Sequence, residues 1–264
     1  MLKKRIIPKL QMRLSKHGSL KKMVLVTTSS FMSHTEIGDP VSQAKIYEAQ
    51  VADELIFLDI DANTNKNEEA LIQVIRKTSE EIFMPITVGG GIKSLDYMRE
   101  LLFSGADKIS INTAAIEDVG LVKNAANFFG NQCVVISIDY ARRKKDGKKR
   151  VYISGGSVET KWDPLSWALE VEKLGAGEIL LTSIDMDGSR EGLDIEMTRL
   201  ISSAVSIPVI SSGGCGKAIH FIEGFKEGGA DAIAAGTFFS YRDQSIMQTR
   251  AQILNAGIPV RVHT

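Results

Sequence analysis

Val134-Val135-Ile136-Ser137-Ile138-Asp139 is the clearest of eight short β-branched runs in this sequence. Runs that are nearly continuous in Val, Ile and Leu are typical of parallel strands covered on both faces. The sequence predicts strands at Arg5–Pro8, Glu54–Asp59, Pro85–Val88, Lys108–Ile111, Val134–Asp139, Glu178–Thr182, Pro208–Ser211 and Ala232–Ala235.

Helical patterns separate most of these runs. Helices are predicted at Asn67–Phe83, Leu95–Ser104, Leu121–Phe129, Pro164–Leu174 and Glu196–Val205. Eight βα units in about 250 residues fit a closed parallel barrel better than an open doubly wound sheet, whose nucleotide site usually shows a GxGxxG motif near the first strand. We therefore predict an α/β protein of the (β/α)8 TIM-barrel class, with one domain over residues 1–264.

An internal repeat divides the chain into two related halves. At one constant offset, Gly105-Ala106-Asp107 recurs as Gly229-Ala230-Asp231, Gly89-Gly90 as Gly213-Gly214, Glu54 as Glu178, and Ile60-Asp61 as Ile184-Asp185. We expect two homologous four-strand half-barrels, covering about residues 1–124 and 125–264. Such a barrel suits a ligand that has two similar ends.

Composition excludes several classes of partner. The 32 Lys and Arg residues balance 32 Asp and Glu residues, which argues against a global basic field that would bind a nucleic acid polymer or a membrane surface. No apolar run approaches the roughly 20 residues that span a bilayer. The opening Met1–Arg5 is charged, and the apolar stretch after it is too short for a signal peptide. We expect a cytoplasmic protein.

Cysteine and histidine residues are scattered along the chain. Cys133 and Cys215 lie far apart without a CxxC partner, which argues against a disulfide framework. The four histidines are His17, His34, His220 and His263. Because none of these residues forms a metal-ligand spacing, we predict neither a metal site nor a cofactor.

Glycine-rich turns follow the third and seventh runs, as Val88–Ile92 and Ser212–Gly216. A threonine at the end of the next strand adds a hydroxyl beside each turn. Barrels hold phosphate with such loop amides, although the glycines can equally serve only to make tight turns. We predict two phosphate sites, formed by Gly90, Gly91, Asn112 and Thr113 and by Gly213, Gly214, Gly236 and Thr237. A phosphorylated small molecule is therefore the expected ligand.

Carboxylates lie at the ends of several predicted strands, where barrel enzymes place catalytic groups. Asp59 and Asp61 end the second strand, Asp139 ends the fifth, and Asp185 and Asp187 follow the sixth. A carboxylate in a closed barrel mouth can act as a general acid or base. Each can equally bind a loop amide or cap a helix, which is the interpretation favoured for Asp61.

Six segments are similar to those of a known family. They are Lys4–Pro8, Phe57–Ile60, Thr87–Ile92, Ser110–Ala115, Gly175–Ser183 and Ser212–Gly214. Across almost the whole chain they closely resemble the cyclase subunit of imidazole glycerol phosphate synthase. The resemblance implies a (β/α)8 barrel of the lyase class, with a separate glutaminase subunit docked on its N-terminal face. Ammonia from glutamine would then cross the barrel and attack a bis-phosphorylated aminoimidazole carboxamide nucleotide.

The resemblance is incomplete at the catalytic positions. The family uses two aspartates as acid and base, and Asp139 matches the second of them. Gln11 stands in place of the first, and Lys9 stands where the family usually has cysteine or another small residue. Because a Gln amide cannot exchange a proton near neutral pH, efficient cyclase chemistry is in doubt. The loop Met12–Ile37 also departs from the family outside His17-Gly18 and Lys21-Lys22.

The opposite end of the barrel keeps the family pattern. Arg5, Glu54, Lys108 and Glu178 begin strands, and the matching residues of the family form a charged ring at the entrance of the ammonia path. We interpret the four residues as an ammonia gate that serves a glutaminase partner. A ring of salt bridges with a purely structural role is the alternative.

Three functions fit these observations. Our leading interpretation is a barrel that conducts ammonia for amidination of a nucleotide sugar, as in paralogues encoded with surface-polysaccharide genes. Such a barrel would pair with a glutaminase and a third protein, a sugar amidotransferase. The alternative is a true cyclase of histidine biosynthesis in which Lys9 or Asp59 replaces the missing acid–base group. A catalytically inactive scaffold for the glutaminase is the third possibility.

Overall fold

Eight parallel strands close into a barrel in the computed structural model, which describes residues 3–15, 22–31, 33–62, 68–240 and 245–262. In spatial order they are β1 (Arg5–Leu14), β4 (Leu55–Asp59), β5 (Ile86–Gly89), β6 (Lys108–Ile111), β7 (Val134–Arg142), β10 (Glu178–Ser183), β11 (Val209–Ser212) and β12 (Ala232–Ala235). The β1–β12 pairing closes the barrel, with Ile7 opposite Ala234. The predicted TIM-barrel class is confirmed.

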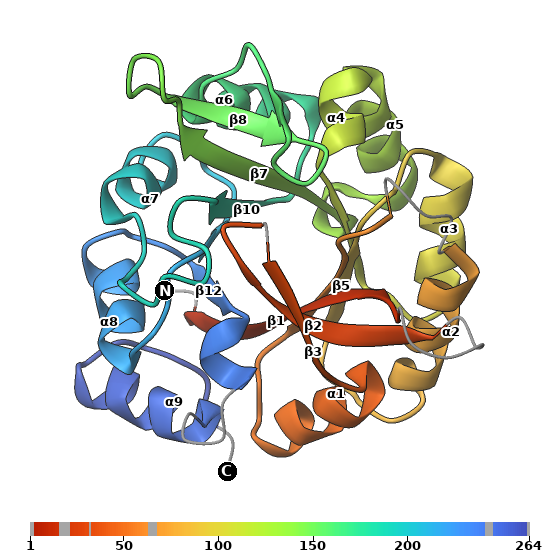
Figure 1. Cartoon of the computed structure of the whole chain (residues 1–264), viewed down its shortest axis with the longest axis vertical. Coiled ribbons are helices and arrows are strands. Elements are labelled where there is room, and N and C mark those ends of the chain that lie inside the picture. Colours follow the sequence, from red (N-terminus) through yellow and green to blue (C-terminus); the bar gives the residue numbers. More distant parts are fainter. Residues whose placement is uncertain (1–2, 16–21, 32, 63–67, 241–244, 263–264) are drawn as a thin grey trace.

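Helices form an outer ring around these strands (Figure 1). They are α1 (Pro40–Ala49), α2 (Glu68–Ser79), α3 (Leu95–Phe103), α4 (Thr113–Glu117), α5 (Val119–Phe129), α6 (Pro164–Leu174), α7 (Ile195–Ser202), α8 (Ala218–Lys226) and α9 (Ile246–Asn255), with short 3-10 turns η1 (Asn131–Cys133) and η2 (Thr237–Ser240). The predicted helix Asn67–Phe83 ends earlier, at Ser79, and residue 67 lies outside the described residues. No helix in the described ranges is long and apolar enough to cross a membrane.

Apolar side chains form two separate layers of core. The larger layer packs between the strands and the helices, and a smaller cluster fills the inside of the barrel. The inner cluster consists of Ile7, Ile56, Val135, Leu180, Ile210, Ala232 and Ala234. Because side chains alternate across a strand, one set of residues on each strand faces the helices and the other fills the barrel.

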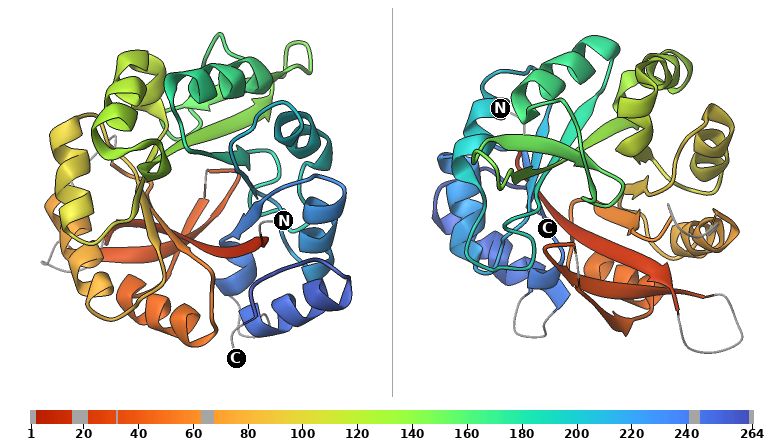
Figure 2. Two further views of the ribbon diagram at one scale, coloured as in Figure 1. Left: turned by 180° about the vertical axis from the view of Figure 1, so that it is seen from behind. Right: turned by 45° about the horizontal axis from the view of Figure 1, so that its top comes forward.

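The segment predicted as the loop Met12–Ile37 is mostly β-structure, so that prediction is wrong. β1 continues to Leu14 and pairs antiparallel with β2 (Met23–Ser29), which pairs with β3 (Ser33–Gly38). The β-branched sequence of β2 accounts for the hairpin, because such residues suit a pleated, half-buried surface. The β2–β3 hairpin folds back so that its Ser30 end lies over the barrel mouth (Figure 1; Figure 2, right). His17-Gly18 and Lys21 of the predicted family pattern lie outside the described residues.

A second extension lengthens β7 beyond the predicted Asp139. β7 runs to Arg142 and pairs antiparallel with β8 (Lys149–Ile153), which continues into β9 (Val158–Glu159). The turn between β8 and β9 lies beside the barrel mouth, where the Ser154 amide donates a hydrogen bond of 3.0 Å to the Thr113 hydroxyl.

The two halves of the chain occupy the two halves of the ring in Figure 1. Each half contains an equivalent local hydrogen bond. The Asp107 carboxylate accepts a hydrogen bond of 2.8 Å from the Ile86 amide. The Asp231 carboxylate accepts one of 3.1 Å from the Val209 amide. Each aspartate thus joins the start of one strand to the start of the next. These matched contacts support the proposed division of one domain into two half-barrels.

The predicted match of Gly89-Gly90 with Gly213-Gly214 is wrong by one residue. Gly90 has a φ of 110° and Gly213 one of 94°, whereas Gly89 is not in the positive-φ region. A Cβ atom would lie 2.3 Å from the Asp59 carbonyl oxygen at Gly90 and 2.5 Å from the Ser183 carbonyl oxygen at Gly213. Gly90 and Gly91 are therefore the structural counterparts of Gly213 and Gly214.

Candidate functional site

Alternate residues of β1 carry the inward-facing side chains from one end of the barrel to the other. Arg5 lies at the N-terminal end, Ile7 belongs to the inner apolar cluster, and Lys9 and Gln11 line cavities at the mouth. This order follows from the two-residue period of a strand. One strand therefore presents a cation, an apolar layer, a second cation and an amide along the barrel axis.

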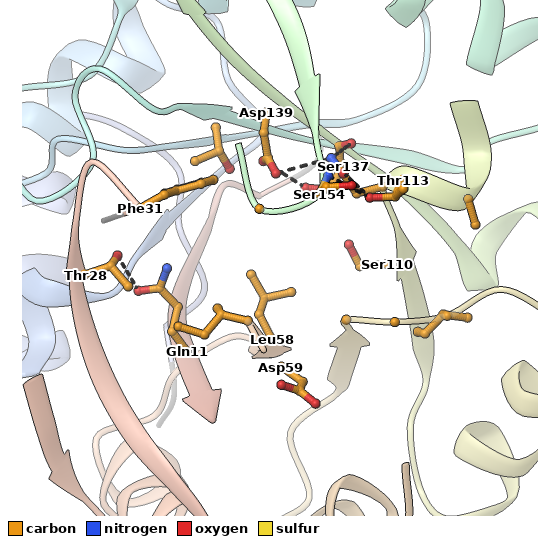
Figure 3. Close-up of a pocket in the computed structure, with 18 of the residues that line it drawn as sticks. Gln11, Thr28, Phe31, Leu58, Asp59, Ser110, Thr113, Ser137, Asp139 and Ser154 are labelled. Carbon is orange, nitrogen blue, oxygen red and sulfur yellow. Dashed lines mark hydrogen bonds between the residues drawn. The ribbon is translucent and has the colours of Figure 1, made fainter. Parts of the chain in front are cut away.

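A cavity of about 240 Å³ opens at the carboxyl ends of the strands. Its polar lining combines carboxylates, two side-chain amides, hydroxyls and basic side chains, and Figure 3 shows several of these groups converging from different strands. Among the residues singled out from the sequence, it is lined by Gln11, Asp59, Gly90, Gly91, Asn112, Thr113 and Asp139. The structure thus brings together the first predicted phosphate turn and the predicted catalytic aspartate.

Asp139 is a buried carboxylate at this mouth with a raised pKa. It accepts hydrogen bonds of 3.2 Å from the Ser137 hydroxyl and 3.2 Å from the Asn112 side-chain amide. Desolvation, together with the negative charge of Asp187, raises the pKa of Asp139 to about 6 against the opposing effects of the Lys9 charge and the Ser137 hydroxyl. A carboxylate with this pKa can exchange protons close to neutral pH.

The second predicted phosphate turn lines a much smaller cavity of about 20 Å³. Gly213, Gly214, Gly236 and Thr237 line it, together with Asp187. A volume of this size accommodates about one water molecule. In this conformation the second turn is therefore closed, whereas the first opens onto the large cavity. Lys9 and Gln11 line both cavities and lie between them.

A hydrogen-bonded chain of three buried side chains closes the second cavity. The Thr28 hydroxyl on β2 lies 2.6 Å from an Asp187 carboxylate oxygen and 3.0 Å from the Gln11 side-chain amide. The Ser30 amide adds a hydrogen bond of 3.0 Å to the Asp187 carbonyl oxygen. Gln11 and Asp187 thus hold the β2–β3 hairpin over the mouth.

The remaining acidic candidates have local structural partners. The Asp59 carboxylate accepts a hydrogen bond of 3.0 Å from the Asp61 amide, although it also lines the large cavity. Asp61 forms a salt bridge of 3.0 Å with Arg13 on β1. Asp185 accepts a hydrogen bond of 2.8 Å from the Arg142 amide. Asp61 and Asp185 therefore hold strand ends in place, and the contact found for Asp61 is a salt bridge rather than the predicted helix cap or turn.

The four predicted gate residues form a closed ring at the N-terminal end of the barrel. Lys108 lies 3.0 Å from Glu54 and 2.9 Å from Glu178, and Arg5 lies 2.8 Å from Glu54. Arg5 also pairs with Glu178. Burial acts to raise the pKa of Glu54, but Lys108 and Arg5 outweigh it and lower that pKa. The Thr87 hydroxyl adds a hydrogen bond of 2.7 Å to Glu54.

Three exposed phenylalanines on the same face were missed by the sequence analysis. Phe83 is 95% exposed, Phe103 is 86% exposed and Phe128 is 58% exposed. They lie after α2, at the end of α3 and near the end of α5, where the chain turns back into the next strand. Their place at the helix ends, just before a strand, was the signal that could have identified them.

The fold and the mouth together place the chain in the class of (β/α)8-barrel proteins with a polar site at the carboxyl ends of the strands. The histidine biosynthesis protein family matches residues 5–244. The putative imidazole glycerol phosphate synthase subunit hisF2 of Prochlorococcus marinus is 50% identical over 99% of both chains. HisF subunits of the same synthase from Clostridium botulinum (strain Okra) and Geobacillus thermodenitrificans are 45% and 46% identical over 99% of this chain and 100% of theirs.

The chain therefore belongs to the histidine biosynthesis protein family and, within it, to the group of imidazole glycerol phosphate synthase HisF subunits.

Proposed function

We propose that this chain is an ammonia-dependent cyclase subunit of imidazole glycerol phosphate synthase. The observation that carries the proposal is Asp139, whose pKa is raised to about 6 in the same cavity as the first glycine turn. The names of the relatives support the same activity. This assignment favours the cyclase alternative over our leading sequence interpretation, since those names refer to the synthase and not to polysaccharide synthesis.

The proposed ligand is a small molecule with two phosphate groups. Gly90, Gly91, Asn112 and Thr113 would bind the phosphate that enters the open cavity. Gly213, Gly214, Gly236 and Thr237 would bind the other, after the hydrogen bonds of Thr28 to Asp187 and Gln11 release the small cavity. Binding of the second phosphate is therefore coupled to movement of the β2–β3 hairpin.

The proposed path of ammonia runs along the barrel axis. It would enter at the ring of Arg5, Glu54, Lys108 and Glu178, which is closed by salt bridges in this structure. The inner apolar cluster follows, and the polar mouth with Asp139 lies beyond it. A neutral ammonia molecule crosses an apolar layer at lower cost than an ammonium ion, because burial of an unpaired charge is strongly unfavourable.

The proposed partner is a glutaminase docked on the N-terminal face of the barrel. The side chains of this face include three exposed aromatic residues on successive βα units, Phe83, Phe103 and Phe128, and the charged ring lies at its centre. Exposed aromatic side chains of this kind are typical energetic centres of protein interfaces. A partner that covers them also covers the ring, as delivery of ammonia into the barrel requires.

A second candidate function has one specific observation in its favour. Gln11 cannot serve as the acid or base that the family places at this position. A barrel that only conducts ammonia needs no such group, and it would deliver ammonia to a third protein, a sugar amidotransferase. An inactive scaffold for the glutaminase also needs none, but it gains no advantage from Asp139 in the cavity.

The decisive experiment uses the purified chain without a partner. Ammonium salt and the bis-phosphorylated aminoimidazole carboxamide nucleotide are supplied, and formation of imidazole glycerol phosphate is measured. We expect turnover in the wild type and a loss of about 100-fold or more in Asp139→Asn, since Asn cannot accept the proton. Absence of turnover in a folded wild-type chain would reject the cyclase and favour ammonia conduction.

The docking surface has its own test. Binding of the glutaminase encoded in the same genome is measured for Phe83→Ser and Phe103→Ser. Each variant is expected to weaken binding by about 10-fold or more, because buried interface aromatics typically contribute over 1 kcal/mol. Ile219→Ser on α8 is the matched control, since Ile219 is exposed but lies at the opposite end of the barrel. Equal affinities for all variants would contradict the assigned surface.

A further inference from the structure

Lys9 is a buried cation that the proposed function leaves without a role. Its side chain is only 4% exposed, yet it lines both mouth cavities. Within the described ranges, no hydrogen bond or ion pair to its ammonium group is found. Lysine is almost never fully buried without a partner. Burial of such a charge is energetically unfavourable, and proteins tolerate it mainly at positions where the amine contacts a ligand or takes part in catalysis.

Two further buried polar groups near Lys9 have no hydrogen-bond partner among the described residues. They are the hydroxyls of Ser110 and Ser212. Ser110 lines the large cavity beside Lys9, and Ser212 lines the small one. Buried polar groups in proteins are nearly always satisfied. The Lys9 amine therefore lies where a ligand that spans both cavities completes the hydrogen bonding.

Gln11 cannot take the proton-transfer role that its position suggests. Its amide does not ionise, and it is held by the Thr28 hydroxyl at 3.0 Å. Lys9 precedes Gln11 by two residues on β1, so both side chains point into the barrel. Arg13 is equally near to Gln11 along the strand, but it forms a salt bridge of 3.0 Å with Asp61. Lys9 is therefore the candidate on β1. Its charge also acts directly on Asp139.

Asp59 is a further ionisable residue that lines the large cavity, as are His34 and Lys93. The Asp59 carboxylate accepts a hydrogen bond of 3.0 Å from the Asp61 amide. With Asp139 also a carboxylate, Asp59 would supply a second base. A protonated amine supplies what the site lacks, which is an acid.

We propose, on the basis of the proposed cyclase function, that Lys9 is the second catalytic residue of this barrel and acts as the general acid opposite Asp139. The reaction class is addition of ammonia to the carbon of a polarised C=O bond. The nitrogen lone pair forms the C–N bond, and the C=O π electrons move to the oxygen. The Lys9 ammonium group protonates that oxygen, and the Asp139 carboxylate takes one proton from the nitrogen.

The same pair returns to its starting state when water leaves. The carbinolamine C–O bond breaks as the protonated Asp139 gives its proton to the departing hydroxyl. The neutral Lys9 amine removes a proton from nitrogen, and the C=N bond forms. One water molecule is released, Lys9 is again an ammonium ion, and Asp139 is again a carboxylate. No oxidant, metal or cofactor is required for this balance.

The test compares substitutions of Lys9 in the ammonium-dependent assay, with rates expressed per concentration of unprotonated ammonia. Lys9→Met removes the proton and the charge. Lys9→Arg keeps the charge, but the guanidinium does not release its proton in a protein. We expect both to lower kcat by about 10²- to 10⁴-fold. Lys77→Met, an exposed substitution on α2, is the control and is expected to keep the wild-type rate.

A double variant distinguishes proton transfer from a structural role. Lys9→Cys/Gln11→Asp restores the residue types that the family usually has at these positions and is expected to recover at least 10-fold of the lost rate. Thermal unfolding confirms that each variant is folded.

Several results would overturn the assignment. Full activity in Lys9→Arg would show that Lys9 contributes only its positive charge and not a proton. Full activity in Lys9→Met would show that Lys9 has no part in catalysis. Loss of activity in Asp59→Asn alone, with Lys9→Met active, would move the role to Asp59. If the folded wild type itself forms no product, the cyclase function fails instead, which separates the two hypotheses.

Discussion

The Thr28 hydroxyl donates its single proton to Asp187 across a distance of 2.6 Å. An ionised carboxylate accepts hydrogen bonds only, and a hydroxyl carries only one proton. The Gln11 side-chain oxygen lies 3.0 Å from the same hydroxyl, which has no second proton for it. A half-turn of the Gln11 amide lets its NH2 group donate to the Thr28 oxygen instead. Without this turn two acceptors would face one proton, and such orientations are assigned from the hydrogen-bond network. Glutamine at position 11 is matched to the hairpin and Asp187.

Replacing Gln11 with aspartate is expected to destabilise the protein above neutral pH. The introduced carboxylate would lie beside a hydroxyl whose one proton already serves Asp187. One of the two carboxylates then has a raised pKa, so the penalty is present above that pKa and is lost as the pH falls and a proton binds. The unfolding free energy from urea titration should fall by about 1 to 3 kcal/mol at about pH 8, and by less at about pH 5.

The control for this prediction is Gln11→Leu. It removes the donor without adding charge, so its cost should not change between the two pH values. An equal pH dependence of the two variants would show that the two carboxylates do not interact. A rise in ammonium-dependent activity in Gln11→Asp alone would instead show that the aspartate tolerates this environment.

Gly90 is expected to be indispensable for the first glycine turn. Its φ of 110° is disfavoured for any other residue, and a Cβ atom would lie 2.3 Å from the Asp59 carbonyl oxygen. Gly90→Ala should cost about 1 to 3 kcal/mol in unfolding free energy and raise KM for the nucleotide. Gly147→Ala is a matched control, since Gly147 also has a positive φ of 70° but has no atom within 4 Å of the added Cβ. Equal effects of Gly90→Ala and Gly147→Ala on both quantities would show that the contact of the added Cβ with the Asp59 carbonyl oxygen is not the cause.

Replacing Lys108 with methionine is expected to damage both the ring and the delivery of ammonia. Glu54 and Glu178 would then share only Arg5, and a buried carboxylate without its partner is costly. We expect the unfolding free energy to fall by about 2 to 4 kcal/mol near neutral pH. This is less than the cost of removing one partner from a fully buried ion pair, because Lys108 is partly exposed. The lowered pKa of Glu54 gives stability that is present above its usual value and lost on acidification. The difference from wild type should therefore shrink at low pH.

Delivery of ammonia by Lys108→Met is measured in complex with the glutaminase, as product formed per glutamine hydrolysed. This ratio should fall, while the rate with added ammonium salt is kept. Lys108→Arg preserves the charge and serves as the control. An unchanged ratio in Lys108→Met would favour a purely structural ring.

The barrel could be predicted because its strands carry a local signal. Runs such as Val134–Asp139 are buried on both faces, and burial on both faces selects continuous apolar sequence. The β2–β3 hairpin could not be found in the same way, since β2 mixes buried, half-buried and exposed residues without a regular period and its pairing with β1 is set by tertiary contacts. The repeat of the glycine pairs was misplaced by one residue because identity of letters does not report which glycine has a positive φ.

The candidate site was predictable only in part. Asp139 and the glycine turns follow from the rule that barrel sites lie at the carboxyl ends of strands. The partner of Gln11 does not, because Thr28 reaches it only after the hairpin folds back, and Asp187 arrives from the other half of the chain. The burial of Lys9 beside both cavities depends likewise on strands that the sequence of β1 does not specify.

Asp139→Asn is expected to abolish activity while stabilising the folded chain. The pKa of Asp139 is raised to about 6 in the folded state, from a usual value near 4. The folded state thus binds this proton more tightly than the unfolded chain, so the ionised carboxylate destabilises the fold above about pH 6. This penalty disappears below about pH 4, where both states are protonated. The difference in unfolding free energy between Asp139→Asn and wild type should therefore be about 1 to 3 kcal/mol more favourable to the variant at about pH 8 than at about pH 4.

Comparison between the two pH values is essential to this prediction, because Asn also changes the hydrogen bonds that Asp139 receives from Ser137 and Asn112. That part of the change does not depend on pH and cancels in the difference. Urea unfolding at both pH values, with the ammonium-dependent rate measured in parallel, completes the test. A difference that is constant with pH would show that Asp139 is not held at a raised pKa, and its role as the base would then lose its physical support. A group that costs stability in its ionised form, and that catalysis requires in that form, is expected where function and not folding selects the residue.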